Sequence, residues 1–115
     1  MGLKGAAARG KSIRRRCSVP TYIILSQWTT DGAKTVKQSP SRVDEARKAL
    51  AANGITLKAF YLVMGQYDHV IVVEAPDDAA FAKAMLTLGA AGNIQTETLK
   101  AFTEDEYRAI VSSLP

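Results

Sequence analysis

The sequence predicts an α+β fold in which two long helices cover one face of a four-stranded sheet. Three observations lead to this prediction. Strand and helix patterns alternate in the order β-α-β-β-α-β. The two middle strand patterns are joined by a very short link. A chain of 115 residues is long enough for one domain with a single core.

The first strand and the first helix are marked by their end signals. Residues 21–28 (TYIILSQW) are β-branched and aromatic, and Pro20 stands at the first strand position, which tolerates proline. A turn-rich stretch follows, with room for a short helical turn. Ser39 then supplies a capping hydroxyl before Pro40. Apolar residues recur at helical spacing up to Asn53–Gly54, where the glycine suits a left-handed stop.

The middle of the sequence predicts a hairpin followed by the second helix. Residues 55–64 (ITLKAFYLVM) and 67–75 (YDHVIVVEA) have strand patterns. Their link, Gly65–Gln66, fits a type II′ turn, in which the glycine takes a positive φ. Asp77 or Asp78 then caps a helix with one apolar face.

The last two elements are an edge strand and a terminal helix. Residues 93–102 (NIQTETLKAF) are more polar than the other strands, which favours an edge position. Thr103 and Glu106 have the spacing of a capping box, and apolar residues follow at helical intervals. The whole order is that of a ferredoxin-like βαββαβ fold with an extra C-terminal helix, and right-handed crossovers place both long helices on one face of the sheet.

The strands are apolar on both faces, which predicts a partner. Ile24 alternates with Ile23 and Leu25, and residues 67–75 carry aliphatic side chains on both sides. Strands of this kind must be covered on both faces, and the two helices cover only one. We therefore expect two copies to stack sheet on sheet as a dimeric α/β barrel with a cavity between them, as a homodimer or higher homo-oligomer. The alternative is that the terminal helix folds over the second face.

The charge of the chain is unevenly distributed. Six of the 15 basic residues lie in residues 1–19, which contain no acid, so residues 20–115 hold nine basic and 11 acidic residues. This balance argues against nucleic-acid binding by the folded domain. Cys17 is the single cysteine, so no disulfide can form within the chain, and a reducing compartment is favoured. No apolar run approaches the ~20 residues that cross a bilayer, so we expect a cytoplasmic protein without a membrane partner.

Residues 1–19 are expected to be a disordered basic leader, and residues 20–115 the folded domain. A nucleic-acid or membrane tail, a targeting peptide and a mis-assigned start codon are the three interpretations of the leader, and we favour the last. Initiation at Val19 would expose Pro20 as the N-terminal residue after methionine removal. An N-terminal proline can act as a base, as in tautomerases; the simpler interpretation is that Pro20 merely begins the strand.

Four segments together resemble the GYD-domain family of small bacterial proteins: PTYIILSQWT, VKQSPSR, LKAFYLVMGQYDHVIVVEAPDD and GNIQTETLKAF. The resemblance covers about residues 20–112 and implies a ferredoxin-like fold of the dimeric α/β-barrel type, without implying a reaction. The residues that carry the motif are Pro40, Gly65, Tyr67, Asp68, Glu74, Pro76 and Thr96–Thr98.

His69, the only histidine, is the centre of the candidate pocket. Residues expected on its face are Tyr22, Ser26, Trp28, Tyr61 and Tyr67. If that face lines the dimer cavity, aromatic walls and one imidazole suit a small organic ligand. If it faces the helices, His69 is a core histidine that bonds a hydroxyl. Asp68 points to the other side and is expected to fix a turn.

The sequence offers no metal site and no cofactor motif. The folded part has one histidine, no cysteine and no spaced carboxylate cluster, and it lacks a phosphate-binding loop. Two function classes remain open. The first, preferred, is a non-catalytic or regulatory small-molecule-binding dimer. The second is a cofactor-independent enzyme, monooxygenase-like or isomerase-like, acting in the dimer cavity, which a strongly displaced pKa would favour.

Overall fold

Residues 19–115 are described by the computed structural model, so residues 1–18 of the predicted leader, with Cys17, lie outside the described residues. The elements are β1 (Thr21–Trp28), α2 (Thr30–Lys34), the 3-10 helix η1 (Val36–Gln38), α3 (Ser39–Ala52), β2 (Thr56–Leu62), β3 (His69–Glu74), α4 (Asp78–Ala90), β4 (Ile94–Ala101) and α5 (Glu104–Ser112). Their order confirms the predicted α+β, ferredoxin-like fold with an extra C-terminal helix.

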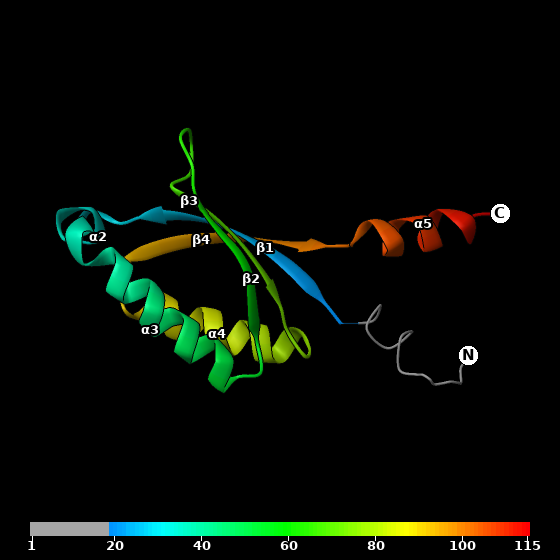
Figure 1. Cartoon of the computed structure of the whole chain (residues 1–115), viewed down its shortest axis with the longest axis horizontal. Helices are drawn as coiled ribbons and strands as arrows, with labels where there is room; N and C mark the ends of the chain where they lie inside the picture. The colour runs from blue at the N-terminus through cyan, green and yellow to red at the C-terminus, as the bar shows by residue number, and fades with distance from the viewer. Residues whose placement is uncertain (1–18) are drawn as a thin grey trace.

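The four strands of this part of the chain form one antiparallel sheet in the order β2-β3-β1-β4. β1 and β3 are central, and the polar strand β4 lies at an edge, as predicted. Both α3 and α4 lie on the same face of the sheet (Figure 1), which is the placement that right-handed crossovers produce.

The core lies between that face and the two helices. Its buried apolar residues are Tyr22, Ile24, Leu50, Ile55, Val73, Ala75, Phe81 and Ala84. The rings of Tyr22 and Phe81 are stacked with their centroids 4.0 Å apart, so β1 and α4 are joined by a large aromatic contact. Val73, on the central strand β3, is completely buried.

The opposite face of the sheet carries no helix of the described chain, and we call it the open face. Because Tyr22, Ile24 and Ser26 point toward the helices, alternation along the strand turns Ile23 and Leu25 outward. Strand register then assigns the rest of the face. Its apolar residues are Ile23, Leu25, Ala59, Tyr61, Val70, Val72 and Leu99.

Helix α5 projects away from the sheet beyond the end of β4 (Figure 1). Its capping box forms as predicted: Thr103 Oγ1 accepts from the backbone N–H of Glu106, and the Glu106 carboxylate accepts from the N–H of Thr103. Its apolar side chains, such as Tyr107 and Ile110, are exposed. The expected alternative, in which the terminal helix covers the second sheet face, is therefore not what the chain adopts.

Two local predictions are corrected by the structure. The predicted two-residue hairpin link is a six-residue loop, residues 63–68, although Gly65 within it does have a positive φ of 138°. Ser39 is the first residue of α3 and not its cap; Gln38 takes the capping position without a side-chain hydrogen bond. In both cases the sequence signal was correct in kind and displaced along the chain.

Gly32 is required by a close backbone approach, which gives a testable pair of substitutions. A Cβ at Gly32 would lie 2.1 Å from the carbonyl oxygen of Asn93, whereas a Cβ at Gly89 in α4 would meet nothing within 4 Å. Gly32→Ala is expected to lower the free energy of unfolding by about 1–3 kcal/mol, because the backbone must shift. Gly89→Ala should raise it by about 0.4–1 kcal/mol. Urea denaturation of both variants measures this, and equal effects would contradict it.

Candidate functional site

A cavity of about 90 Å³ lies between the sheet and the helix layer. Hydrocarbon side chains form most of its wall: Leu50, Leu57, Phe60, Ile71, Met85 and Leu88. Polar groups enter it from a few positions, chiefly Ser26, His69 and Arg42. A small apolar cavity with a few polar groups is the usual form of a small-molecule site.

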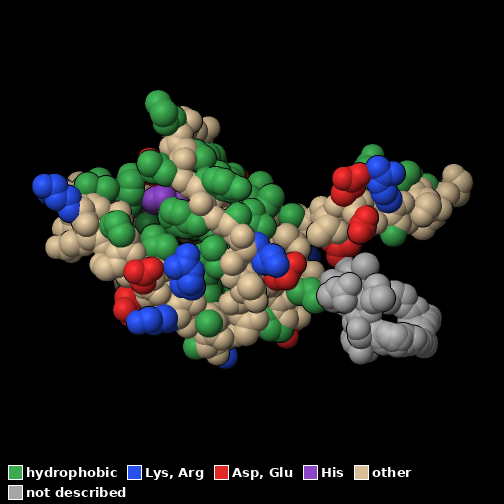
Figure 2. Space-filling model, in the orientation of Figure 1, with side chains coloured by type: hydrophobic (Ala, Val, Ile, Leu, Met, Phe, Trp, Pro, Cys, Tyr) green, Lys and Arg blue, Asp and Glu red, His purple; other side chains and the backbone are tan. Residues whose placement is uncertain are grey.

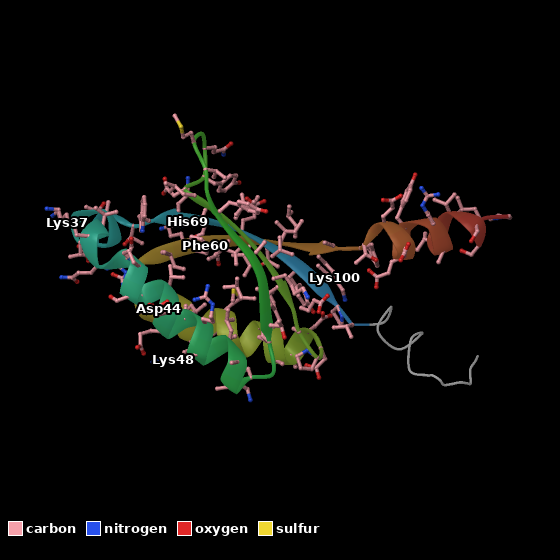
Figure 3. All side chains as sticks on the ribbon, in the orientation of Figure 1. Lys37, Asp44, Lys48, Phe60, His69 and Lys100 are labelled. Atoms are coloured by element: carbon pink, nitrogen blue, oxygen red, sulfur yellow. The ribbon has the colours of Figure 1, made fainter. Side chains whose placement is uncertain are left out.

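His69 begins β3 and points into this layer. It is 6% exposed, and its Nδ1 lies 3.3 Å from Oγ of Ser26, which is 1% exposed. The imidazole is nearly perpendicular to the Trp28 ring, with the centroids 4.6 Å apart, and the Phe60 ring centroid lies 5.3 Å from that of the imidazole; Figure 3 shows His69 and Phe60 side by side. The imidazole is visible from outside among hydrophobic side chains (Figure 2).

The protonation of His69 is set by this environment. Burial lowers the pKa of His69, and the negative charge of the neighbouring Asp68 opposes that change only in part. Burial disfavours the charged imidazolium, so His69 is neutral at neutral pH. A neutral imidazole bonded at Nδ1 keeps Nε2 for one further hydrogen bond.

Four of the six residues predicted for the pocket lie on the helix-facing side of the sheet. Ser26, Trp28 and His69 line the cavity. Tyr22 is buried on the same side, but it packs against α4 and is not part of the cavity wall. The second of the two expected orientations, in which His69 faces the helices and meets a hydroxyl, is therefore the one that the structure adopts.

The other two, Tyr61 and Tyr67, lie on the open-face side. A β-bulge between Leu57 and Ala59 reverses the alternation of β2, so that Tyr61 is paired with Val70 of the open face. Tyr67 belongs to the loop before β3, and its hydroxyl donates to the Glu97 carboxylate at 2.5 Å, a bond that raises the pKa of Tyr67. The six residues thus do not surround one pocket.

Tyr67 and Asp68 fasten the β2–β3 loop to strands β1 and β4. The Asp68 carboxylate accepts from the backbone N–H of Trp28 at 2.9 Å, and the Asp68 N–H donates to the carbonyl of Ser26 at 2.8 Å. Tyr67 reaches Glu97 on β4. Three residues of the GYD-like motif therefore hold the end of the sheet in place, a role that requires no chemistry.

The remaining motif residues are at structural positions. Pro40 is the second residue of α3, and Glu74 ends β3. Pro76 lies beside Gly54, where its ring would be 3.1 Å from an added Cβ. Pro20 directly precedes β1, and its carbonyl accepts a hydrogen bond from the backbone N–H of Ala75. It is not part of the cavity wall.

Ser26 and His69 resemble a nucleophile and its base, but the surroundings do not complete a catalytic arrangement. A serine nucleophile needs an accessible hydroxyl, an oriented base and donors for the oxyanion. Ser26 is almost fully buried. The carboxylate next to His69 in the sequence, that of Asp68, already accepts a hydrogen bond from the backbone N–H of Trp28. Among residues 19–115 no three potential metal ligands cluster, and no helix is long and apolar enough to cross a membrane.

Arg42 is the cavity residue that the sequence analysis missed. It lies on α3, one turn before Ala46 and two before Leu50, both of which line the cavity. Its guanidinium donates to the carbonyl and hydroxyl of Thr35 at 3.2 and 3.0 Å and to the carbonyl of Gly32 at 3.2 Å. Its only signal in the sequence was its position four residues before Ala46, in line with the apolar side of α3.

Known structures share this fold at low sequence identity. A feast or famine regulatory protein from M. tuberculosis, complexed with L-methionine, is 16% identical with a TM-score of 0.50, covering 84% of this chain and 58% of that one. An AsnC family transcriptional regulator from Agrobacterium tumefaciens is 16% identical with a TM-score of 0.51, covering 86% and 60%. The chain thus spans about three fifths of these regulators, and the likeness establishes the fold alone.

A protein of Thermus thermophilus is a much nearer relative. It is 45% identical over 84 residues, which are 72% of this chain and 88% of that protein, and it is named the glutamine synthetase and cystathionine beta-lyase binding protein. The GYD domain family model matches residues 22–111, which is nearly the whole described part. This chain therefore belongs to the GYD domain family.

Proposed function

We propose that the protein is a non-catalytic, regulatory binding protein that takes up a small organic molecule in the cavity beside His69 and works as a homodimer. The observation that carries the proposal is the cavity wall, which is hydrocarbon apart from a few polar groups and contains no carboxylate. A wall of this kind provides burial and orientation for a ligand. It provides no second acid or base for proton transfer.

The composition of the open face supports the proposed homodimer. Its centre, Ile23, Leu25, Val70 and Val72, is apolar and uncharged on two neighbouring strands. A two-fold interface brings a patch against its own copy, so a patch without charge at its centre is complementary to itself. A charged partner would leave its own charges unpaired on this surface. The exposed apolar side of α5 adds further surface that a second copy can cover.

Binding to a metabolic enzyme is the second part of the proposed role. The Thermus relative is named for binding glutamine synthetase and cystathionine beta-lyase, and 45% identity supports a similar kind of partner for this chain. We expect purified glutamine synthetase or cystathionine beta-lyase to form a complex with the protein in biolayer interferometry. Absence of binding to both enzymes, with or without a cavity ligand, would contradict this part of the role.

Filling the cavity provides the test of ligand binding. Ala46 lines the cavity, whereas Ala51 is exposed on the same helix, so Ala46→Leu and Ala51→Leu are a matched pair. Trp28 is the only tryptophan of the chain and also lines the cavity, so its fluorescence reports occupancy. We expect branched four- or five-carbon alcohols, amides and acids, as a group, to change Trp28 fluorescence in the parent protein and in Ala51→Leu.

Ala46→Leu is expected to lose that response while remaining folded, because a larger aliphatic group occupies the space that the ligand needs. Circular dichroism of the variant checks its folding. No response to any member of the group in the parent protein would overturn the proposed ligand-binding function. A response that persists unchanged in folded Ala46→Leu would place binding outside the cavity and would also overturn it.

A further inference from the structure

The cavity limits the apolar part of a ligand to a short, compact chain. Its volume of about 90 Å³ is smaller than the ~150 Å³ of an engineered apolar cavity that binds benzene. Ile24 and Ile71 from the sheet face Val43 and Leu88 from the helices across this space. A branched aliphatic group fits such a wall better than a long flexible chain, because it fills a short space with less lost conformational freedom.

Arg42 supplies a positive charge at this wall without an acidic partner. Its bonds go to the neutral oxygens of Thr35 and Gly32. By contrast, Arg47 is paired with Asp44 on the same helix, and no carboxylate of residues 19–115 lies within ion-pair distance of Arg42.

The guanidinium of Arg42 also keeps free donors. Arginine has five N–H groups, and the three bonds of Arg42 all start from Nη1 and Nη2. The Nε–H and at least one more N–H are therefore without an acceptor in the described chain. A carboxylate accepts such a pair in bidentate geometry, so Arg42 is suited to an anionic head group.

The cavity wall has no acidic side chain that could pair with an ammonium group. The polar residues that line the cavity are serines, threonine, histidine and arginine, and none of them is acidic. An amino acid would bring its ammonium beside Arg42 without a carboxylate to pair it, which costs free energy. The wall therefore favours an acid from which the amino group is absent.

We propose that the cavity binds a small branched-chain monocarboxylate without an ammonium group, a simple or 2-oxo acid. The Arg42 guanidinium holds the carboxylate, and the apolar wall beside His69 holds the chain. This inference rests on the proposed ligand-binding function and adds the ligand's chemical class to it.

The test compares isosteres by Trp28 fluorescence and isothermal titration calorimetry with the full chain. The probes are 4-methyl-2-oxopentanoate and 3-methylbutanoate, with 3-methylbutanamide as the neutral match, L-leucine as the ammonium match and acetate as the acid without a branched chain. We expect the two branched acids to bind at least about tenfold more tightly than the amide, L-leucine and acetate. A hydrogen bond to a charged group contributes ~1.5–3 kcal/mol, which is a tenfold or larger change.

Arg42→Gln and Arg47→Gln are the matched variants. Arg42→Gln should bind the branched acids at least about tenfold more weakly and bind the amide with unchanged affinity, which shows that the cavity is intact. Arg47→Gln, which loses the same charge from an exposed ion pair, should bind all probes as the parent does.

Three results would overturn the ligand class while leaving the proposed binding function standing. These are equal binding of acid and amide, tight binding of L-leucine, and unchanged acid binding in Arg42→Gln. Binding of none of the probes would remove the proposed function together with the ligand class. The two failures are therefore distinguishable in one set of titrations.

Discussion

Replacing Val72 with glutamate is expected to convert the proposed homodimer into a folded monomer. Val72 lies on central strand β3, paired with Ile23 on one side and Ala59 on the other, in the middle of the open face. Across a two-fold axis each copy would bury an unpaired carboxylate, at a cost of several kcal/mol per ion. The dissociation constant should rise at least ~100-fold, which corresponds to about 2.7 kcal/mol.

Sedimentation equilibrium at micromolar concentrations measures this effect. Ala82→Glu, on the exposed side of α4, changes the net charge equally and should leave the dimer intact. The variant Val72→Glu should keep the circular dichroism spectrum of the parent, since position 72 faces outward in the single chain. A parent protein that is monomeric, or a Val72→Glu variant that dimerises as the parent does, would refute the sheet-to-sheet dimer.

Tyr22→Ala is expected to cause the largest loss of stability among single truncations in the core. Tyr22 is almost fully buried and stacked on Phe81, so its removal leaves a large cavity between β1 and α4. Truncation of a buried aromatic residue to alanine costs ~3–5 kcal/mol. Urea denaturation at one fixed protein concentration measures this loss, because the stability of the proposed dimer would depend on concentration.

Tyr22→Phe distinguishes the contribution of the Tyr22 hydroxyl to stability from that of its ring. The hydroxyl donates to the carboxylate of Asp78, which also pairs with Lys100 at 3.1 Å. Removing only this bond should cost ~0.5–1.5 kcal/mol, because the stacked ring remains. If Tyr22→Phe were as destabilising as Tyr22→Ala, the stabilisation would come from the polar contact instead of the aromatic one.

The same pair predicts a pH dependence at alkaline pH. Burial, followed by the hydrogen bond to Asp78, raises the pKa of Tyr22 from 10.0 to about 12. The folded state thus favours the protonated phenol. The contribution of Tyr22 to the free energy of unfolding is complete below pH 10 and is lost as the pH rises toward 12. Tyr22→Phe should lack this part of the alkaline loss, as denaturation curves between those pH values would show.

Local signals in the sequence were sufficient to predict the elements and their order. Asn53–Gly54 ends α3 with a φ of 75° at the glycine, Asp77 caps α4, and Thr103 with Glu106 caps α5. Each of these signals acts within one helical turn, so it requires no tertiary contact to be recognised. The loop between β2 and β3 was predicted too short because strand alternation continues, in the sequence, beyond the residues that pair.

The candidate site could be predicted only in part, and strand geometry is the reason. Both faces of β1 and β3 are apolar, so alternation shows that Ser26 and His69 lie on opposite sides from Leu25 and Val70 without showing which side meets the helices. The bulge near Lys58 then turns the Tyr61 side chain to the open face. Tyr67 lies in the loop before β3, where strand alternation does not apply. Arg42 was missed because the cavity that it lines is formed by residues of the sheet and of both long helices, which no local pattern in the sequence brings together.

The sequence by itself determined the kind and order of the secondary-structure elements and those helix ends that carry capping signals at Asn53–Gly54, Asp77 and Thr103, since these depend on contacts between residues a few positions apart. Only the tertiary structure decided that His69 lies beneath the helices in a cavity that Arg42 also lines, and that α5 leaves the open face bare. Those outcomes depend on the crossover connections, on a one-residue bulge and on packing between distant segments, and no local pattern contains them.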